Sequence, residues 1–173
     1  YSKHIPGSSV FTPQMVINGT HSAIGYKTDE LLEKVKEASK IAPARIELVE
    51  ITGKDVKGTP KENESQLKIQ INLPNLSDRR DSDNAQNMKL WVAEYKKEKT
   101  ASIPYKSGDA AQVTHINVVT DKHFIEWDSR QASLEIELPR QTEGQGIVIF
   151  VQQDNGRILA TGTLEWPTED ELN

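Results

Sequence analysis

Residues 11–20 read FTPQMVINGT, and this stretch decides how the N-terminal part of the chain folds. Pro13 has no N–H to donate, so it suits the first position of a strand, and a short apolar run follows it. Asn18-Gly19 is the strongest short signal for a two-residue type I′ hairpin turn, because both central residues must tolerate positive φ. Residues 21–25 would then form the returning strand. The stretch therefore predicts a β-hairpin that begins at a proline.

A helix is expected directly after this hairpin, over residues 28–40. Its apolar residues recur at helical spacing and form one stripe, which consists of Leu31, Leu32, Val35 and Ala38. We expect this stripe to pack into a core, and we expect Pro43 to mark the end of the unit. The order of proline, strand, Asn-Gly turn, strand and helix resembles the second half of a thioredoxin fold.

From residue 44 onward the apolar period changes from helical to two. The clearest case is residues 67–73, where Leu and Ile alternate with Lys, Gln and Asn, as in a half-buried antiparallel strand. Further strands are expected at residues 46–51, 88–95, 113–119, 133–138, 147–152 and 157–164, with a short apolar piece at residues 124–127. Residues 96–99 are expected to form a solvated edge or turn, and residues 75–87 a charged loop. Seven or eight short strands without an intervening helix are typical of an antiparallel β-sandwich.

The predicted fold class is therefore α+β and mostly β, with two domains. Residues 1–42 would be the C-terminal half of a thioredoxin-like fold, a β-hairpin plus a helix, and residues 43–167 an antiparallel β-sandwich. Residues 168–173 would be an acidic tail. Because an isolated hairpin is only marginally stable in water, this one needs other residues packed against it as a cover. The cover could come from the sandwich, from a second copy in a homodimer, or from a missing N-terminal fragment held noncovalently.

Composition excludes several classes of function. The 173 residues carry a net charge of −5, which argues against nucleic-acid binding because that needs a concentrated basic face. The sequence has no run approaching the roughly 20 apolar residues of a membrane span. The chain contains no cysteine, so it cannot perform thiol catalysis, form disulfides or bind zinc through thiolates. No cofactor is expected.

No metal site is predicted either. The histidines show no ligand spacing of the HExxH kind; they are His4, His21, His115 and His123. A cluster of acidic and amide residues in the charged loop lacks the glycine and the terminal glutamate of a calcium-binding loop; it consists of Asp78, Asp81, Asp83 and Asn84. A solvated loop explains that cluster.

The pattern as a whole resembles the secreted bacterial proteins of the DUF1223 type, in which a thioredoxin-like domain precedes a β-sandwich. The matching stretches are residues 10–19, 90–92, 117–119, 149–152 and 156–159. The resemblance implies a secreted or periplasmic protein whose cysteine-containing N-terminal half is absent from this chain. One departure concerns Ile116, which stands where a histidine is expected, while His115 lies one place earlier. A shift of one residue in a strand places a side chain on the opposite face.

The resemblance also implies a site. In thioredoxin-like folds the proline is cis and keeps a main-chain edge open beside the cysteines, where an extended substrate peptide can pair with the preceding residue. Thr12, Pro13 and Gln14 are therefore the candidates for a substrate edge, whereas a trans proline that merely begins a strand is the simpler alternative. No catalytic residue is expected in this chain.

Two functions follow from this reading. In the first, the parent protein is a thiol–disulfide oxidoreductase that acts on an extended peptide or protein, and this chain is redox-inactive by itself. In the second, the β-sandwich is a non-enzymatic binding or interaction module on a thioredoxin-like platform. An intact Cys-x-x-Cys in the N-terminal half would favour the first.

Overall fold

The computed structural model describes residues 3–5, 9–51, 66–79, 88–104 and 110–168. The chain begins with the hairpin β1 (Gln14–Ile17) and β2 (His21–Ile24), followed by helix α1 (Thr28–Ser39). The later elements are β3 (Ala44–Arg45), β4 (Glu47–Glu50), β5 (Gln66–Asn72), the short 3-10 helix η1 (Ser77–Arg79), β6 (Met88–Pro104), β7 (Ala110–Ile125), β8 (Ser133–Pro139), β9 (Gln145–Gln153) and β10 (Ile158–Trp166).

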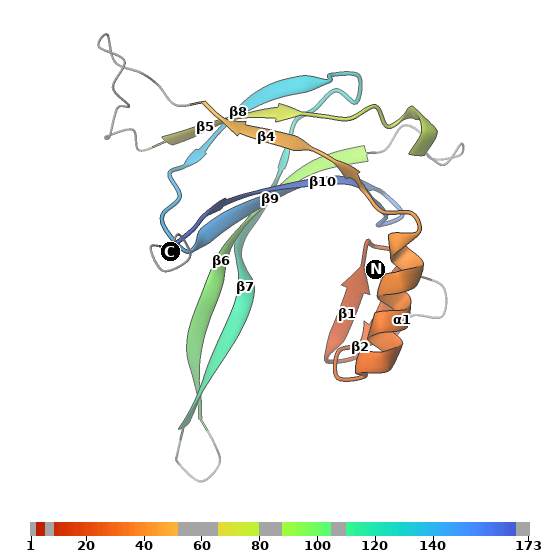
Figure 1. Ribbon diagram of the computed structural model, residues 1–173, viewed down its shortest axis with the longest axis vertical. Helices are drawn as coiled ribbons and strands as arrows, with labels where there is room; N and C mark the ends of the chain where they lie inside the picture. The colour runs from red at the N-terminus through yellow and green to blue at the C-terminus, as the bar shows by residue number, and fades with distance from the viewer. Residues whose placement is uncertain (1–2, 6–8, 52–65, 80–87, 105–109, 169–173) are drawn as a thin grey trace.

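The strands form three sheets, so the prediction of a mostly β chain is confirmed. Five strands lie in the order β3-β10-β9-β6-β7, three in the order β4-β5-β8, and β1 pairs with β2. Figure 1 shows the three-stranded sheet lying over the five-stranded one. No helix among the described residues is long and apolar enough to span a membrane.

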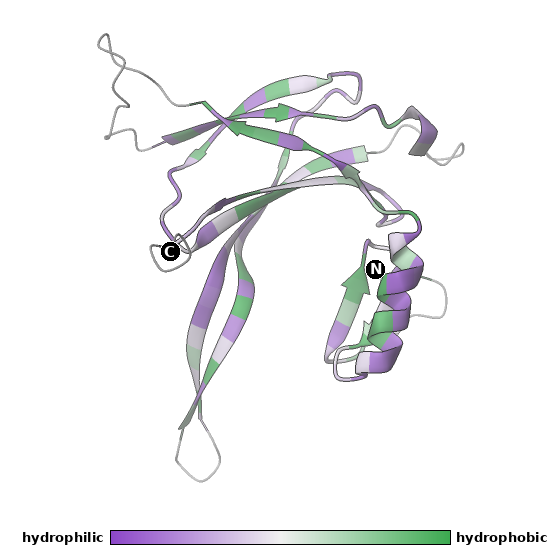
Figure 2. Ribbon diagram, viewed as in Figure 1, coloured by the Kyte–Doolittle hydropathy of each residue, from purple (hydrophilic) through white to green (hydrophobic). Residues whose placement is uncertain are grey.

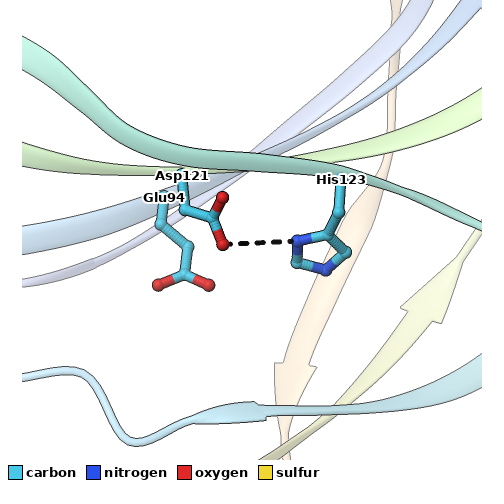
Figure 3. Close-up of side chains that lie close together, drawn as sticks. All are labelled: Glu94, Asp121 and His123. Atoms are coloured by element: carbon cyan, nitrogen blue, oxygen red, sulfur yellow. Dashed lines mark ion pairs between the residues drawn. The ribbon is translucent and has the colours of Figure 1, made fainter.

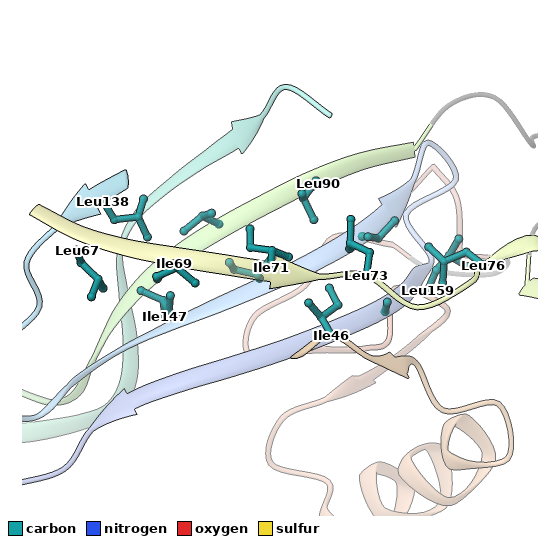
Figure 4. Packing of buried hydrophobic residues seen from close by; sticks show 14 residues of the cluster. Ile46, Leu67, Ile69, Ile71, Leu73, Leu76, Leu90, Leu138, Ile147 and Leu159 are labelled. Atoms are coloured by element: carbon teal, nitrogen blue, oxygen red, sulfur yellow. The ribbon is translucent and has the colours of Figure 1, made fainter. Parts of the chain in front are cut away.

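One hydrophobic core joins the two larger sheets, because apolar residues at alternate positions of their strands face each other (Figure 4). The alternation predicted for residues 67–73 is confirmed, since its apolar members are all buried. The buried cluster consists of Ile46, Leu67, Ile69, Ile71, Leu73, Leu76, Leu90, Val92, Leu138, Ile147, Ile149, Val151, Leu159 and Ala160.

The large sheet is mixed, so the expectation of purely antiparallel strands is wrong at one edge. β3 runs parallel to β10, with Ala44 opposite Ala160, and the Ile46 N–H donates to the Thr161 carbonyl at 2.8 Å. Gly162 permits this approach, because a Cβ there would overlap the Ile46 carbonyl oxygen. A strand of two residues has too little pattern to be found from sequence.

The β6–β7 hairpin is longer than predicted. Residues 96–99, expected at an edge or turn, continue β6, and residues 113–119 form one strand with residues 124–125. The outer part of the hairpin leaves the core as a twisted two-stranded arm (Figure 1). Its charged side chains are solvated on both faces, and β7 pairs with alternate backbone groups of β6, so no apolar alternation is needed there.

Two sequence-based expectations fall outside the described residues. These are most of the charged loop at residues 75–87 and the tail beyond residue 168. Within the charged loop, the described residues include the 3-10 turn of Ser77–Arg79.

Candidate functional site

The Asn18-Gly19 turn has the backbone angles that the sequence predicts. φ is 49° at Asn18 and 71° at Gly19, and the Thr20 N–H donates to the Ile17 carbonyl at 3.0 Å. Strand pairing resumes only at His21, which lies opposite Ile17. Three residues therefore connect the strands, so the predicted loop length of two is one residue short.

The same turn joins the hairpin–helix unit, which consists of β1, β2 and α1, to the turn between β9 and β10. The Ile158 N–H donates to the Asn18 carbonyl at 2.9 Å, and Asn18 Nδ2 donates to the Ala38 carbonyl of α1 at 3.5 Å. A Cβ on Gly19 would overlap the Gly156 carbonyl oxygen, so the two turns are in close backbone contact. The β-rich part of the chain thus covers one end of the hairpin.

The predicted substrate edge lies at the start of β1. The Thr12-Pro13 peptide bond is cis, as the resemblance implied, and the side chains of both residues are exposed. The Pro13 carbonyl accepts a hydrogen bond from the Gly25 N–H at 2.9 Å and so points toward β2. Because backbone groups alternate in direction along a strand, those of Thr12, Gln14 and Val16 point away from β2. Gln14 Nε2 donates to the Ser9 carbonyl at 3.3 Å.

The helix stripe does not form the core that its spacing predicts. Ala38 is buried, but Leu32 and Val35 are 52% and 44% exposed, and Met15 of β1 is 46% exposed. Figure 2 shows apolar residues interspersed with polar ones along α1 and β1. Helical spacing indicates that a face is suited to burial, but it does not supply the partner that buries it. The hairpin–helix unit thus has apolar residues that the described part of the chain leaves uncovered.

A cavity of about 240 Å³ lies where the hairpin–helix unit meets the β9–β10 turn, and it is lined by Thr20, His21, Glu37 and Arg157 among others. The Thr20 hydroxyl and His21 Nδ1 are 2.8 Å apart, and His21 Nε2 is 3.8 Å from Glu37 Oε2. A hydrogen bond from Lys34 lowers the pKa of the Glu37 carboxyl. The lining therefore combines a histidine with groups of both charges.

The comparison with family models decides the assignment. A family model described as a protein of unknown function, DUF1223, matches residues 1–152. The chain belongs to the DUF1223 family. No curated protein and no solved structure matched it.

In this DUF1223 member the three predicted site residues, Thr12, Pro13 and Gln14, lie consecutively where β1 begins, and their role stays a prediction. Sequence reasoning did not anticipate the cavity beside His21. It also missed a cluster in which Glu94 of β6 lies beside Asp121 and His123 of β7 (Figure 3). The cluster depends on the strand register, and the only sequence signal for it is the alternation that places Asp121 and His123 on one face.

Proposed function

We propose that the hairpin–helix unit is the proline-containing half of a thioredoxin-like domain, and that its β1 edge binds an extended peptide. The single observation that carries this proposal is the uncovered edge and face of the unit: β1 pairs only with β2 among the described strands, and Leu32 and Val35 of α1 are exposed. A complete thioredoxin-like domain would bury such residues of α1. The order of strand, strand and helix after Pro13 agrees with that origin.

The direction of the backbone groups supports the choice of this edge. Thr12 and Val16 direct their N–H and carbonyl groups away from β2, and the Thr12 side chain is exposed. An extended peptide could add to β1 as a further strand, since main-chain hydrogen bonds give affinity in this mode of recognition.

The parent protein in this proposal is a secreted or periplasmic thiol–disulfide oxidoreductase. Its cysteines would belong to the other half of the domain, and that half would cover the apolar residues of α1. This chain, which has no cysteine, would supply the peptide edge, with the two larger sheets as an accessory β-sandwich. Its own contribution is therefore binding without redox turnover.

The variant Val16→Pro tests the peptide edge. It removes the outward N–H of Val16, while the hydrogen bonds between β1 and β2 use the alternate residues. We expect binding of the reduced and alkylated insulin B chain, measured by calorimetry, to weaken about tenfold, since a lost hydrogen bond is worth about 1 kcal/mol or slightly more. Val16→Thr keeps both the N–H and the β-branched shape, so it should bind like the original chain.

Backbone amide shifts of the unsubstituted protein provide a readout that does not depend on the folding of the proline variant. Addition of the alkylated peptide should shift the amides of Thr12 and Val16 more than those of β5. Shifts confined to the larger sheets, or equal binding by Val16→Pro and Val16→Thr, would contradict the proposal.

A second candidate function is a non-enzymatic interaction module, and the β6–β7 arm favours it. This arm carries exposed apolar residues beyond the last residue of β6 that pairs with β9, with Ile103 44% and Ile116 63% exposed. Apolar side chains on such an arm are accessible to a partner, which could bury them on binding. If the arm is the functional element, a bound partner would protect the amides of β6 and β7 from exchange and leave β1 unaffected.

A further inference from the structure

The register of β6 and β7 brings three potential metal ligands onto one face of the five-stranded sheet. Glu94 lies directly opposite Asp121, and Val92 lies opposite His123. Asp121 and His123 are two residues apart, so their side chains project from the same face, which is also the face of Glu94 (Figure 3). The ligand atoms of the three side chains all lie within 4.8 Å of one another.

A β-bulge fixes the backbone at this point. Glu94 pairs with Asp121, but the next residue of β6, Tyr95, pairs with Val119, so Thr120 is the extra residue of β7. The Thr120 hydroxyl donates to the Glu94 carbonyl at 3.2 Å. Bulges of this kind redirect side chains and occur often beside functional sites.

Among the described residues, no Lys or Arg forms an ion pair with the carboxylates of the cluster. Like charges directly opposite each other on neighbouring strands are destabilising. None of the ion pairs found among the described residues joins Glu94 or Asp121 to a lysine or arginine. The adjacent Lys122 instead places its Nζ over the Trp91 ring, 4.0 Å from the centroid. The side chain that lies next to Asp121 is His123, whose Nδ1 is 4.0 Å from Asp121 Oδ2.

Outer hydrogen bonds orient both carboxylates. Gln141 is 6% exposed, and its Nε2 donates to Glu94 Oε2 and to the Pro139 carbonyl, each at 3.0 Å. The Lys122 N–H donates to Asp121 Oδ1 at 2.8 Å. Each bond engages one carboxylate oxygen, so the other oxygen can face a metal, as in metal sites whose ligands are oriented by a second layer of groups.

We propose that Glu94, Asp121 and His123 bind one divalent transition-metal ion, for which Zn²⁺ is the appropriate probe. Zinc accepts imidazole nitrogen and carboxylate oxygen at about 2.0–2.2 Å, so tetrahedral ligand atoms lie roughly 3.4 Å apart. Ligand atoms that are 4.8 Å apart therefore need to approach by roughly 1.4 Å, which rotation of the Asp121 and His123 side chains can supply. The Asp121 and His123 side chains are 68% and 42% exposed, so the fourth position is open to water.

Titration of the metal-free, untagged chain with Zn²⁺, followed by calorimetry, tests this proposal. We expect one Zn²⁺ per chain, and binding at least about tenfold weaker in His123→Gln, Asp121→Asn and Glu94→Gln. The control is His115→Gln, since His115 lies on the same strand, is exposed and stands outside the cluster. The control should bind Zn²⁺ like the original chain.

The imidazole nitrogens of His123 give a second readout that needs no variant. Zn²⁺ should shift the ring nitrogen signals of His123 by NMR and leave those of His115 in place. Equal Zn²⁺ affinity in all four variants, or an absence of Zn²⁺ binding together with unshifted His123 signals, would overturn the proposal. The contact between His123 and Asp121 would then have no part in metal binding. Neither readout depends on peptide binding at β1, so the two proposals stand or fall separately.

Discussion

A side chain at position 19 would be unfavourable for two reasons, namely the backbone conformation of Gly19 and the close packing around it. Its φ of 71° lies in the left-handed region, and a Cβ would overlap the Gly156 carbonyl oxygen. We expect Gly19→Ala to lower the opening free energy of the hairpin–helix unit by about 2–4 kcal/mol, which combines left-handed strain with overpacking. Native-state hydrogen exchange of the α1 amides measures this free energy.

Gly144 provides the matched control for this prediction. Its φ of 69° is nearly the same, but the nearest atom to an added Cβ is Thr168 Cγ2 at 3.6 Å, an ordinary contact distance. Gly144→Ala should therefore cost only the backbone strain, and it should leave the exchange of α1 unchanged. If both variants loosened α1 equally, close contact between the Gly19 and Gly156 turns could not be the cause.

At the scale of residues, the sequence predicts backbone conformations that follow from residue type, but it does not predict which residues become neighbours across strands. The positive φ angles of Asn18 and Gly19 follow from residue type, so the sequence predicts them. The proximity of Glu94 to Asp121 depends on a register that spans a 27-residue separation and includes a bulge at Thr120. A bulge shifts the pairing by one residue, and no pattern in the sequence of β7 predicts where it falls.

Among the elements, α1 shows most clearly that apolar residues at helical spacing are not always buried. We expect Leu32→Gln to change the opening free energy of the hairpin–helix unit by about 0.5 kcal/mol or less, because Leu32 is 52% exposed. Ala23→Leu in β2 should cost about 1–3 kcal/mol, because Ala23 is 1% exposed and has no room for a larger side chain. Hydrogen exchange of the α1 amides compares the two variants directly.

A large loss in Leu32→Gln would show that something buries this residue in solution, as a homodimer would. Sedimentation of the same samples would then decide whether a second copy is the cover. The spacing of Leu31, Leu32, Val35 and Ala38 was thus a correct guide to a helix and an incorrect guide to its packing in this chain.

For the whole molecule, the alternation of apolar and polar residues was enough to predict a mostly β chain. It failed for β3, whose two residues carry no period, and for the outer β6–β7 arm, whose strands bury little. In both places hydrogen bonding with a neighbouring strand decides the structure, and such pairing leaves little trace in a single sequence.

The distribution of buried residues implies two levels of stability in the molecule. The common core draws its members from residues 46–160, while the hairpin–helix unit buries Ala23 and Ala38 and meets the rest through the Asn18-Gly19 turn. We expect amides of β1, β2 and α1 to exchange at least about tenfold faster than those of β5 and β9, which corresponds to about 1.4 kcal/mol. Hydrogen exchange with mass spectrometry on the intact chain measures the difference. Equal protection throughout would contradict this expectation, because it would mean that the unit and the larger sheets unfold as one cooperative body. The few contacts at the Asn18-Gly19 turn would not explain such cooperative unfolding.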